Sequence, residues 1–290
     1  MRIGLAVAMS LVLVGCLVPS VSMPAGAAVD MYDGRWHFTL APYVWLPTIN
    51  GTLNLQAPGT RSSSLGGLLG ATPPPGTTVA VTLGPSSYLS NLNFAFLGYF
   101  EARKSNWSLF TDVIDISAAT QKSSVTTVDF GRGPIQISPS FNTNTSASFS
   151  SLIATLAVGY TVVHKDMSTL DVFGGGQYIN ISASVNWSLT GPRDLFPQSG
   201  SLGRSQELLA GVAGIKGNLQ LGTSRWFVPY FFDVGTGGFS TWQAMAGIGY
   251  AFSWGDVALT YRHLYVDTPS GNVIQNTTLD GPMLGVVFHW

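Results

Sequence analysis

The last ten residues of the chain, 281–290, constrain its fold more than any other segment. They read Gly-Pro-Met-Leu-Gly-Val-Val-Phe-His-Trp, with Leu284, Val286, Phe288 and Trp290 at every second position. Successive side chains point to opposite faces of a β-strand, so this spacing predicts a strand with one apolar face. A strand at the edge of a sheet exposes unpaired backbone N–H and C=O groups. We therefore expect this strand to close onto the first strand of the chain.

Charge is scarce in this chain. Charged residues are 9% of its 290 residues, whereas roughly 25% is typical of soluble globular domains. Hydrophobic residues reach 46%, yet beyond the N-terminal segment no apolar run approaches the roughly 18 residues that a membrane-spanning helix requires. The formal net charge is −1 and Lys and Arg are scattered, so we expect no nucleic-acid partner. This composition favours a single membrane domain built from strands.

Residues 1–28 have the pattern of an export signal. Arg2 supplies the positive charge, residues 3–18 supply the apolar core, and Ala25-Gly26-Ala27 is a small-residue cleavage site. The pattern predicts a signal peptide over 1–28, export through the Sec pathway and a barrel domain over 29–290.

A competing interpretation uses Cys16, the one cysteine of the chain. Leu13-Val14-Gly15-Cys16 resembles a bacterial lipobox, which would make Cys16 the acylated first residue of a lipoprotein. After conventional cleavage the mature chain would instead contain no cysteine, and therefore no disulfide.

Ten segments of the mature chain alternate between apolar and polar residues. In the segment 89–103, Phe96 and Phe100 share one face, whereas Glu101 and Arg103 share the other. Apolar side chains outward and polar side chains inward are typical of membrane β-barrels. The predicted strands are 36–46, 89–103, 107–119, 149–163, 169–189, 206–221, 226–235, 241–252, 257–267 and 281–290. We predict an all-β fold, a closed antiparallel up-and-down transmembrane barrel of about 10 strands, within a range of roughly 8 to 12.

The links between these segments alternate in length. Long Ser/Thr-rich links such as 47–88 and 121–147 alternate with short turns such as 104–106. Within the link 121–147 we expect strand extensions around residues 126–130 and 135–137. Bacterial outer-membrane barrels have short periplasmic turns and longer extracellular loops. This asymmetry predicts that both ends of the barrel domain lie on the periplasmic side. In the first long link, an apolar patch at Leu65, Leu68 and Leu69 is either an ordinary loop turn or a constriction folded into the mouth.

The segment 169–189 contains Gly174-Gly175-Gly176. The apolar positions before the glycines, such as Val172, and those after them, such as Ile179 and Ile181, fall on different parities. This change predicts a β-bulge at the glycines.

A soluble lipocalin-like barrel is the alternative architecture. Its alternation would be inverted, with apolar side chains inside and polar ones outside. In this chain the polar face carries the charged residues, and the apolar face carries bulky residues flanked by Trp and Tyr. A membrane barrel fits that pattern better.

The C-terminal segment resembles the signature of bacterial outer-membrane β-barrels, in which alternating apolar residues lead to a final aromatic residue. The family usually ends in Phe, so Trp290 departs from it. The resemblance implies that Phe288 and Trp290 form the signal read by the barrel assembly machinery, and that outer-membrane lipid surrounds the protein.

Most of the mature chain also looks like a group of largely uncharacterised, porin-like proteobacterial outer-membrane β-barrel proteins. The matching segments are Pro42–Leu46, Glu101–Arg103, Thr241–Ala244, Gly247–Tyr250, Tyr261–Leu264 and Gly281-Pro282. Gln177 departs from the group, which often has Arg there. The resemblance implies a bacterial outer-membrane location, but little about activity.

Seven charged residues fall on the inward faces of the predicted strands. They are Glu101, Arg103, Asp112, Asp171, Lys216, Asp233 and Arg262. The interior of a barrel of this size is narrow, and buried charges are costly unless they are paired. Either these residues form a structural network that fills the lumen, or they line a narrow polar pathway and tune its selectivity.

The function predicted from these charges is limited passage of small polar solutes, without enzymatic activity. The alternative is a closed structural or surface-interaction barrel that acts through its extracellular loops. A third hypothesis, an outer-membrane hydrolase, needs a catalytic histidine.

The four histidines form no catalytic pattern in the sequence. His37, His164 and His289 fall at the predicted periplasmic ends, where we expect interfacial or turn roles. His263 falls near the outer rim beside Tyr265, which favours a place in the interfacial aromatic belt. The His-x-Ser motif of lipid A deacylases and the Asp and Asp-His sets of omptin proteases are missing from the sequence. We expect no catalytic, cofactor or metal site.

Overall fold

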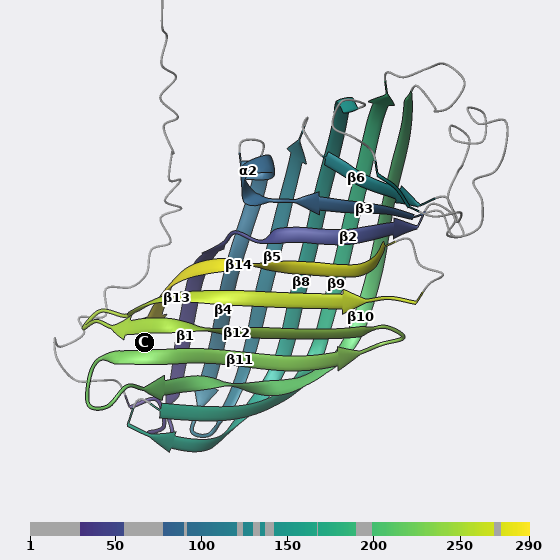
Figure 1. The fold of residues 1–290 in the computed structure, drawn as a ribbon. Helices are drawn as coiled ribbons and strands as arrows, with labels where there is room; N and C mark the ends of the chain where they lie inside the picture. The colour runs from purple at the N-terminus through teal and green to yellow at the C-terminus, as the bar shows by residue number, and fades with distance from the viewer. Residues whose placement is uncertain are drawn as a thin grey trace, which may run out of the picture.

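Ten antiparallel strands close into a ring in the computed structural model, as predicted (Figure 1). The structure describes residues 30–54, 78–89, 92–120, 124–129, 134–136, 142–166, 168–189, 199–269 and 274–290. The ring strands are β1 (Trp36–Trp45), β4 (Leu92–Lys104), β5 (Trp107–Thr120), β8 (Asn142–Lys165), β9 (Ser168–Leu189), β10 (Ser199–Gln220), β11 (Trp226–Thr236), β12 (Ser240–Ala251), β13 (Asp256–Asp267) and β14 (Ile274–His289). They follow one another around the ring in chain order. The predicted signal peptide and the predicted patch at Leu65 to Leu69 lie outside the described residues.

The last strand closes onto the first, as predicted from its sequence. The second half of β14 pairs with β1, with Leu40 opposite Phe288 and Val44 opposite Leu284. The backbone N–H of Phe38 donates to the carbonyl of Trp290 at 2.8 Å, and the reverse bond measures 3.1 Å. These bonds satisfy backbone groups that an open sheet edge would leave unpaired.

The two long links form additional strands at one end of the ring. Those in the second link lie where the sequence predicts strand extensions, whereas those in the first link were not predicted. These elements are β2 (Thr48–Asn54), β3 (Thr78–Leu83), the short helix α2 (Pro85–Tyr88), β6 (Ser124–Asp129) and β7 (Pro134–Gln136). The strands extend the sheet in the order β14, β2, β3, β6, β7. The predicted long links 47–88 and 121–147 therefore contain sheet. Among the described residues no helix is long and apolar enough to cross a bilayer.

The outer surface of the ring carries an apolar belt. Leu156 is 59% exposed and Leu259 is 54% exposed, and both point away from the lumen. At the end with the short turns, aromatic rings contact one another, as in Trp107 with Tyr160. Exposed side chains of the belt include Trp36, Leu40, Val44, Phe96, Phe100, Leu109, Val158, Leu219, Val234, Ile248 and Leu284. Apolar bands flanked by aromatic girdles are a property of membrane barrels.

The predicted β-bulge at the three glycines is wrong. Strand β9 pairs with β8 without interruption through this run, with Gly175 opposite Ala157 and Gly176 opposite Leu156. The inward parity is unchanged along β9, because Asp171 and Ile179 are both buried inside. The apolar residues after the glycines face inward because the interior itself becomes apolar there.

Strands β8, β9 and β10 continue beyond the apolar belt, and there their outer face is polar and their inner face is apolar. These strands are 24, 22 and 22 residues long. Their outer face there is polar: the hydroxyl oxygens of Ser148 and Ser184 lie 2.7 Å apart, and Asn180 donates to Glu207 at 3.5 Å. On the inner face at this level, Ile181 is 3% exposed. The end of the barrel with the long links therefore has the apolar interior and polar exterior of a water-soluble β-structure.

Candidate functional site

The structure places all seven predicted charges on the inner face of the ring. Glu101, Arg103, Asp171, Lys216, Asp233 and Arg262 are each at most 9% exposed, and the side chain of Asp112 is 12% exposed. They come from six of the ring strands, β4, β5, β9, β10, β11 and β13, through the alternation that the sequence predicts. The seven residues separate into two networks, both of which cross the lumen.

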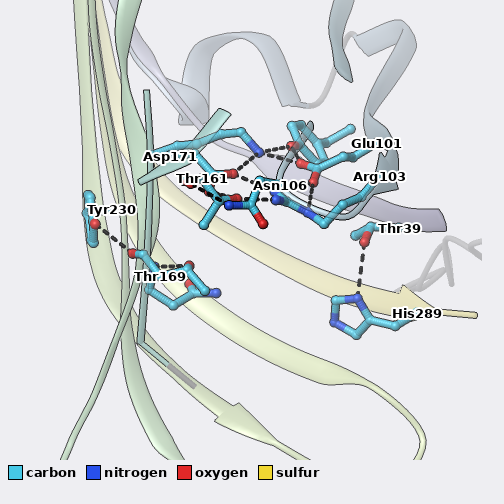
Figure 2. Close-up of polar contacts among 12 residues, drawn as sticks. Thr39, Glu101, Arg103, Asn106, Thr161, Thr169, Asp171, Tyr230 and His289 are labelled. Atoms are coloured by element: carbon cyan, nitrogen blue, oxygen red, sulfur yellow. Dashed lines mark hydrogen bonds and ion pairs between the residues drawn. The ribbon is translucent and has the colours of Figure 1, made fainter. Parts of the chain in front are cut away.

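The first network lies near the short turns and joins β4, β9 and β10. Arg103 Nη2 lies 2.7 Å from Glu101 Oε1 and also contacts Asp171. Lys216 Nζ contacts Glu101 and lies 3.4 Å from Asp171 Oδ2. Thr161 donates a hydrogen bond of 2.6 Å to Asp171. Figure 2 shows Glu101, Arg103 and Asp171 pointing toward one another. Two acids and two bases balance here, as burial of charge requires.

The ion pair between Lys216 and Glu101 spans the lumen. In the order of strands around the ring, β4 is second and β10 is sixth, so these side chains come from opposite walls. The ammonium group also lies 4.7 Å from the ring centroid of Phe110. Side chains that meet from opposite walls occupy the space through which a solute would have to pass.

The second network lies further from the short turns and centres on Arg262 of β13. Its guanidinium lies 2.7 Å from Asp112 Oδ2 on β5 and donates to Gln243 Oε1 at 2.6 Å. Tyr43 donates to Asp112 at 2.6 Å. The guanidinium carbon also lies 5.4 Å from the ring centroid of Trp45. Because β5 and β13 are third and ninth in the ring, this pair also bridges distant walls.

Asp233 differs from the other six charged residues. Gln243 donates to its Oδ2 at 2.7 Å, whereas its Oδ1 has no hydrogen-bond partner in the described part of the chain. The side chain is 0% exposed. A buried carboxyl with an amide partner in place of a cation is an uncommon arrangement. The sequence predicts its inward position but gives no signal for its partner.

An apolar cluster fills the lumen beyond the charged networks. Ile114, Ile153, Ile179 and Leu264 in this cluster are each at most 1% exposed. The other buried members are Tyr43, Trp45, Ile49, Ile116, Ile181, Ala210, Val212, Phe239, Val266, Leu279 and Met283. Tyr43 of β1 and Val212 of β10 come from opposite walls of the ring. We call this set the lumen core.

A hydrogen-bonded chain at the closing strands was not predicted from the sequence. His289 Nδ1 lies 3.1 Å from Thr39 Oγ1 (Figure 2). Its Nε2 lies 3.0 Å from Asp256 Oδ2. The chain joins β1, β14 and β13 on their inner face. Instead of the predicted interfacial or turn role, His289 therefore fastens the junction between the first strand and the last. The alternation of β14 places His289 on the inner face, and this alternation is the sequence signal from which its inward contact could have been predicted.

The residues before β1 cover the interior near the short turns. The ring of Tyr32 stacks on His164 at 4.2 Å and lies 5.3 Å from the guanidinium carbon of Arg103. Burial raises the pKa of Tyr32. His37 Nε2 lies 2.7 Å from Asp33 Oδ1, and this contact holds the pKa of Asp33 below its usual value. The N-terminal segment therefore packs against the first charged network.

His263 lies on the outer face, as the sequence predicts. Its ring centroid is 4.6 Å from that of Trp242, and its Nδ1 is 3.3 Å from Asp280 Oδ1. Among the residues that the structure describes, no group of three His, Cys, Asp or Glu side chains is placed to hold a metal ion.

No protein-family model and no curated protein sequence matches this chain. Among solved structures, the outer membrane protease OmpT from Escherichia coli superposes with a TM-score of 0.55 and 9% identity, over 89% of this chain and 98% of OmpT. The translocator domain of the autotransporter NalP from Neisseria meningitidis gives 0.36 and 14% identity, over 89% of this chain and 90% of that domain. OpdQ from Pseudomonas aeruginosa gives a TM-score of 0.21 at 9% identity, over 88% of this chain and 99% of OpdQ. The likeness to OmpT supports the barrel fold alone. The resemblance to one proteobacterial group stays a prediction.

Proposed function

We propose that this protein is a non-enzymatic, integral outer-membrane β-barrel whose lumen is closed, and that its extracellular end carries out its function. The observation that carries the proposal is the bridging of opposite walls by Lys216 with Glu101, and of distant walls by Arg262 with Asp112. Of the functions predicted from the sequence, the closed surface-interaction barrel fits this geometry better than passage of small polar solutes.

The energetics of the interior support a closed lumen. A polar solute on the axis would have to separate both cross-lumen ion pairs, and breaking a buried pair costs about 3–5 kcal/mol. It would then meet the lumen core, where Ile179 and Leu264 are 0% exposed. An apolar layer offers no hydrogen bonds to replace those that the solute makes with water.

The outer surface supports a place in the bacterial outer membrane. The apolar belt would contact lipid, and the aromatic rings at the short turns would lie at the periplasmic interface. The polar faces of β8, β9 and β10 beyond the belt would then stand in water on the cell surface, together with the sheet formed by β2, β3, β6 and β7. In this proposal the chain is exported through the Sec pathway and assembled through the signal at Phe288 and Trp290.

Cysteine labelling in intact bacteria tests both the location and the closure. The single native cysteine, Cys16, lies in the predicted signal peptide. A membrane-impermeant maleimide should react with Ser148→Cys, because that side chain is exposed beyond the belt. It should not react with Ile179→Cys, which lies in the lumen core.

Labelling after denaturation provides the control that each cysteine is present. Reaction of Ile179→Cys in the folded protein at the rate of Ser148→Cys would favour an open lumen and solute passage. Failure of Ser148→Cys to react in intact cells would contradict the proposed orientation.

A further inference from the structure

The ring is incompletely paired between β1 and β4. Their pairing runs from Trp36 opposite Lys104 to Pro42 opposite Gly98, and ends there. Beyond this point, residues 43–45 of β1 pair with β14, and β4 pairs with β5 as far as Leu92. In the part of the chain that the structure describes, residues 92–97 therefore have a strand neighbour on one side. We call this junction, formed by residues 43–45 and 92–97, the β1–β4 seam.

The seam arises from the path of the chain after β1. The N–H of Leu46 donates to the carbonyl of Pro282 at 3.0 Å, and β2 continues along β14 with Thr48 opposite Asp280. At Gly281 an added Cβ would lie 2.2 Å from the carbonyl oxygen of Leu46, so the two segments approach closely here. Figure 1 shows β2 beside β14, whereas β4 continues toward α2. Beyond Pro42 and Gly98, the two strands that form the seam thus follow different partners.

The outer side of the seam is apolar. Val44 is 58% exposed, Phe94 is 53% exposed and Phe96 is 56% exposed. The apolar surface also extends further along β4 than on the neighbouring strands. Phe94 is level with Ser117 of β5, which is level with the exposed Ser150 of β8. The aromatic residues of β4 beside the seam therefore continue the apolar belt past the register at which β5 and β8 already present serines.

The inner side of the seam is apolar too, and its side chain on β4 is less tightly covered than the side chains beside it on β5 and β8. Leu97, Ile114 and Ile153 occupy one inward row across β4, β5 and β8. Ile114 and Ile153 are each 1% exposed, whereas Leu97 is only partly buried. Trp45, across the seam, belongs to the lumen core. Leu208 of β10, at the far end of the same row, is partly buried as well. Leu97 is the partly buried member of the row that stands at the seam.

The described strands leave residues 92–97 unpaired on the side of β1, and a strand edge of this kind beside lipid requires a partner with two properties. Unpaired backbone N–H and C=O groups cost several kcal/mol each, roughly, in a hydrocarbon environment. A partner at the seam must therefore offer polar atoms to the backbone of β4 and hydrocarbon to Val44, Phe94 and Phe96. An amphiphile of the surrounding bilayer has both.

We propose that the β1–β4 seam is a binding site for one outer-leaflet lipid, with its hydrocarbon chain against Phe96, Val44 and Leu97 and its polar end at the free edge of residues 92–97. The site rests on the proposed membrane location of the barrel, but not on closure of its axis. It gives the apolar interior a lateral contact with the bilayer that the ion pairs on the axis do not obstruct.

Photo-crosslinking in native outer membranes tests the site. A benzophenone side chain at Leu97 should give an adduct with the mass of a lipid, measured on the compact folded band. The same group at Met245 should give none, because Met245 is also an inward, partly buried neighbour of the lumen core but lies on β12, away from the seam. A benzophenone group at the exposed Leu259 of the belt should react with lipid, and this control shows that the crosslinking reaction works in these membranes.

Native mass spectrometry of the unmodified chain gives an independent measurement. One retained lipid is expected; Phe96→Asn should lose it, and Leu156→Asn, in the belt on β8, should keep it. Equal adducts at Leu97 and Met245, no lipid adduct at Leu97 when Leu259 gives one, or a crosslink from Leu97 to a second copy would each overturn the proposal. Equal lipid retention by the two Asn variants would do the same.

Discussion

At the residue scale, the inward charges stabilise the barrel as pairs, so each should be costly to remove alone. Lys216→Met would leave Glu101 buried beside a single cation, and an unpaired buried charge costs about 3–5 kcal/mol. We expect a fall of that size in the free energy of unfolding, measured by urea titration in detergent. Lys104→Met, at an exposed position above the ring of Trp36, should change it by less than about 1 kcal/mol.

The double variant Glu101→Gln, Lys216→Met tests the coupling between the two residues. If they contact across the lumen, the double variant should be more stable than the sum of the two single changes predicts. Strict additivity would mean that the side chains do not meet.

The hydrogen-bonded chain of Thr39, His289 and Asp256 at the junction of β1, β14 and β13, here called the clasp, leads to a second prediction at the residue scale. His289→Ala removes hydrogen-bond partners from Thr39 and Asp256, each bond contributing about 1 kcal/mol. The temperature at which the folded band disappears on SDS gels should fall. His263→Ala is the matched control, because the contact of His263 with Asp280 also joins β13 to β14 but does not reach β1. Equal shifts in the two variants would contradict a special role for the clasp.

The sequence predicts which residues face inward, but not which of them meet. Alternation alone places Glu101 and Lys216 in the lumen. Their contact depends on how far each strand is staggered around the ring, and the pattern of single strands does not contain that stagger. The amide partner of Asp233 could not be predicted for the same reason.

At the scale of single elements, the three glycines of β9 differ in how strictly their position requires glycine, and Gly175 is the position with the least space for a side chain. A Cβ at Gly175 would lie 2.1 Å from the carbonyl oxygen of Leu156 and 2.6 Å from Cβ of Ala157. At Gly176 the nearest atom would be 3.9 Å away. Gly175→Ala should therefore destabilise the barrel by about 1–3 kcal/mol, whereas Gly176→Ala should be nearly neutral in the same urea titration. The reverse order would show that β8 and β9 do not approach each other closely inside the lumen.

The mistaken bulge has a physical origin. An outward apolar residue below the glycines and an inward apolar residue above them look like a change of parity when a single environment is assumed. In the proposed membrane location, strand β9 passes from a level with lipid outside to a level with water outside. Ile179 and Ile181 are therefore apolar on the inner face without any change in register. The short strands β2 and β3 were not predicted because β2 pairs with β14, and β3 with β2 and β6. These are long-range contacts that the residues of the two strands do not encode.

At the scale of the whole molecule, the ring could be predicted because scarce charge, alternation and a strand-like C-terminal segment all favour it. The proposed closure of the lumen could not be predicted from the sequence, because it depends on side chains from many strands that meet at one level. Both charged networks contain their own counter-ions, apart from Asp233, so the interior has no consistent sign of charge with which to attract a solute.

Single-channel recording of the purified protein in a planar bilayer is the most direct test of the closed lumen. If the lumen is closed, folded protein should give no discrete conductance steps, with folding verified by the heat-dependent gel shift. The variant with Ile114, Ile179 and Leu264 replaced by Gly should conduct if it folds, because it removes side chains from three walls of the lumen core. Discrete, ion-selective steps from the unmodified protein, altered by Arg262→Ala or Glu101→Ala, would contradict the account and show that the lumen charges line a pathway.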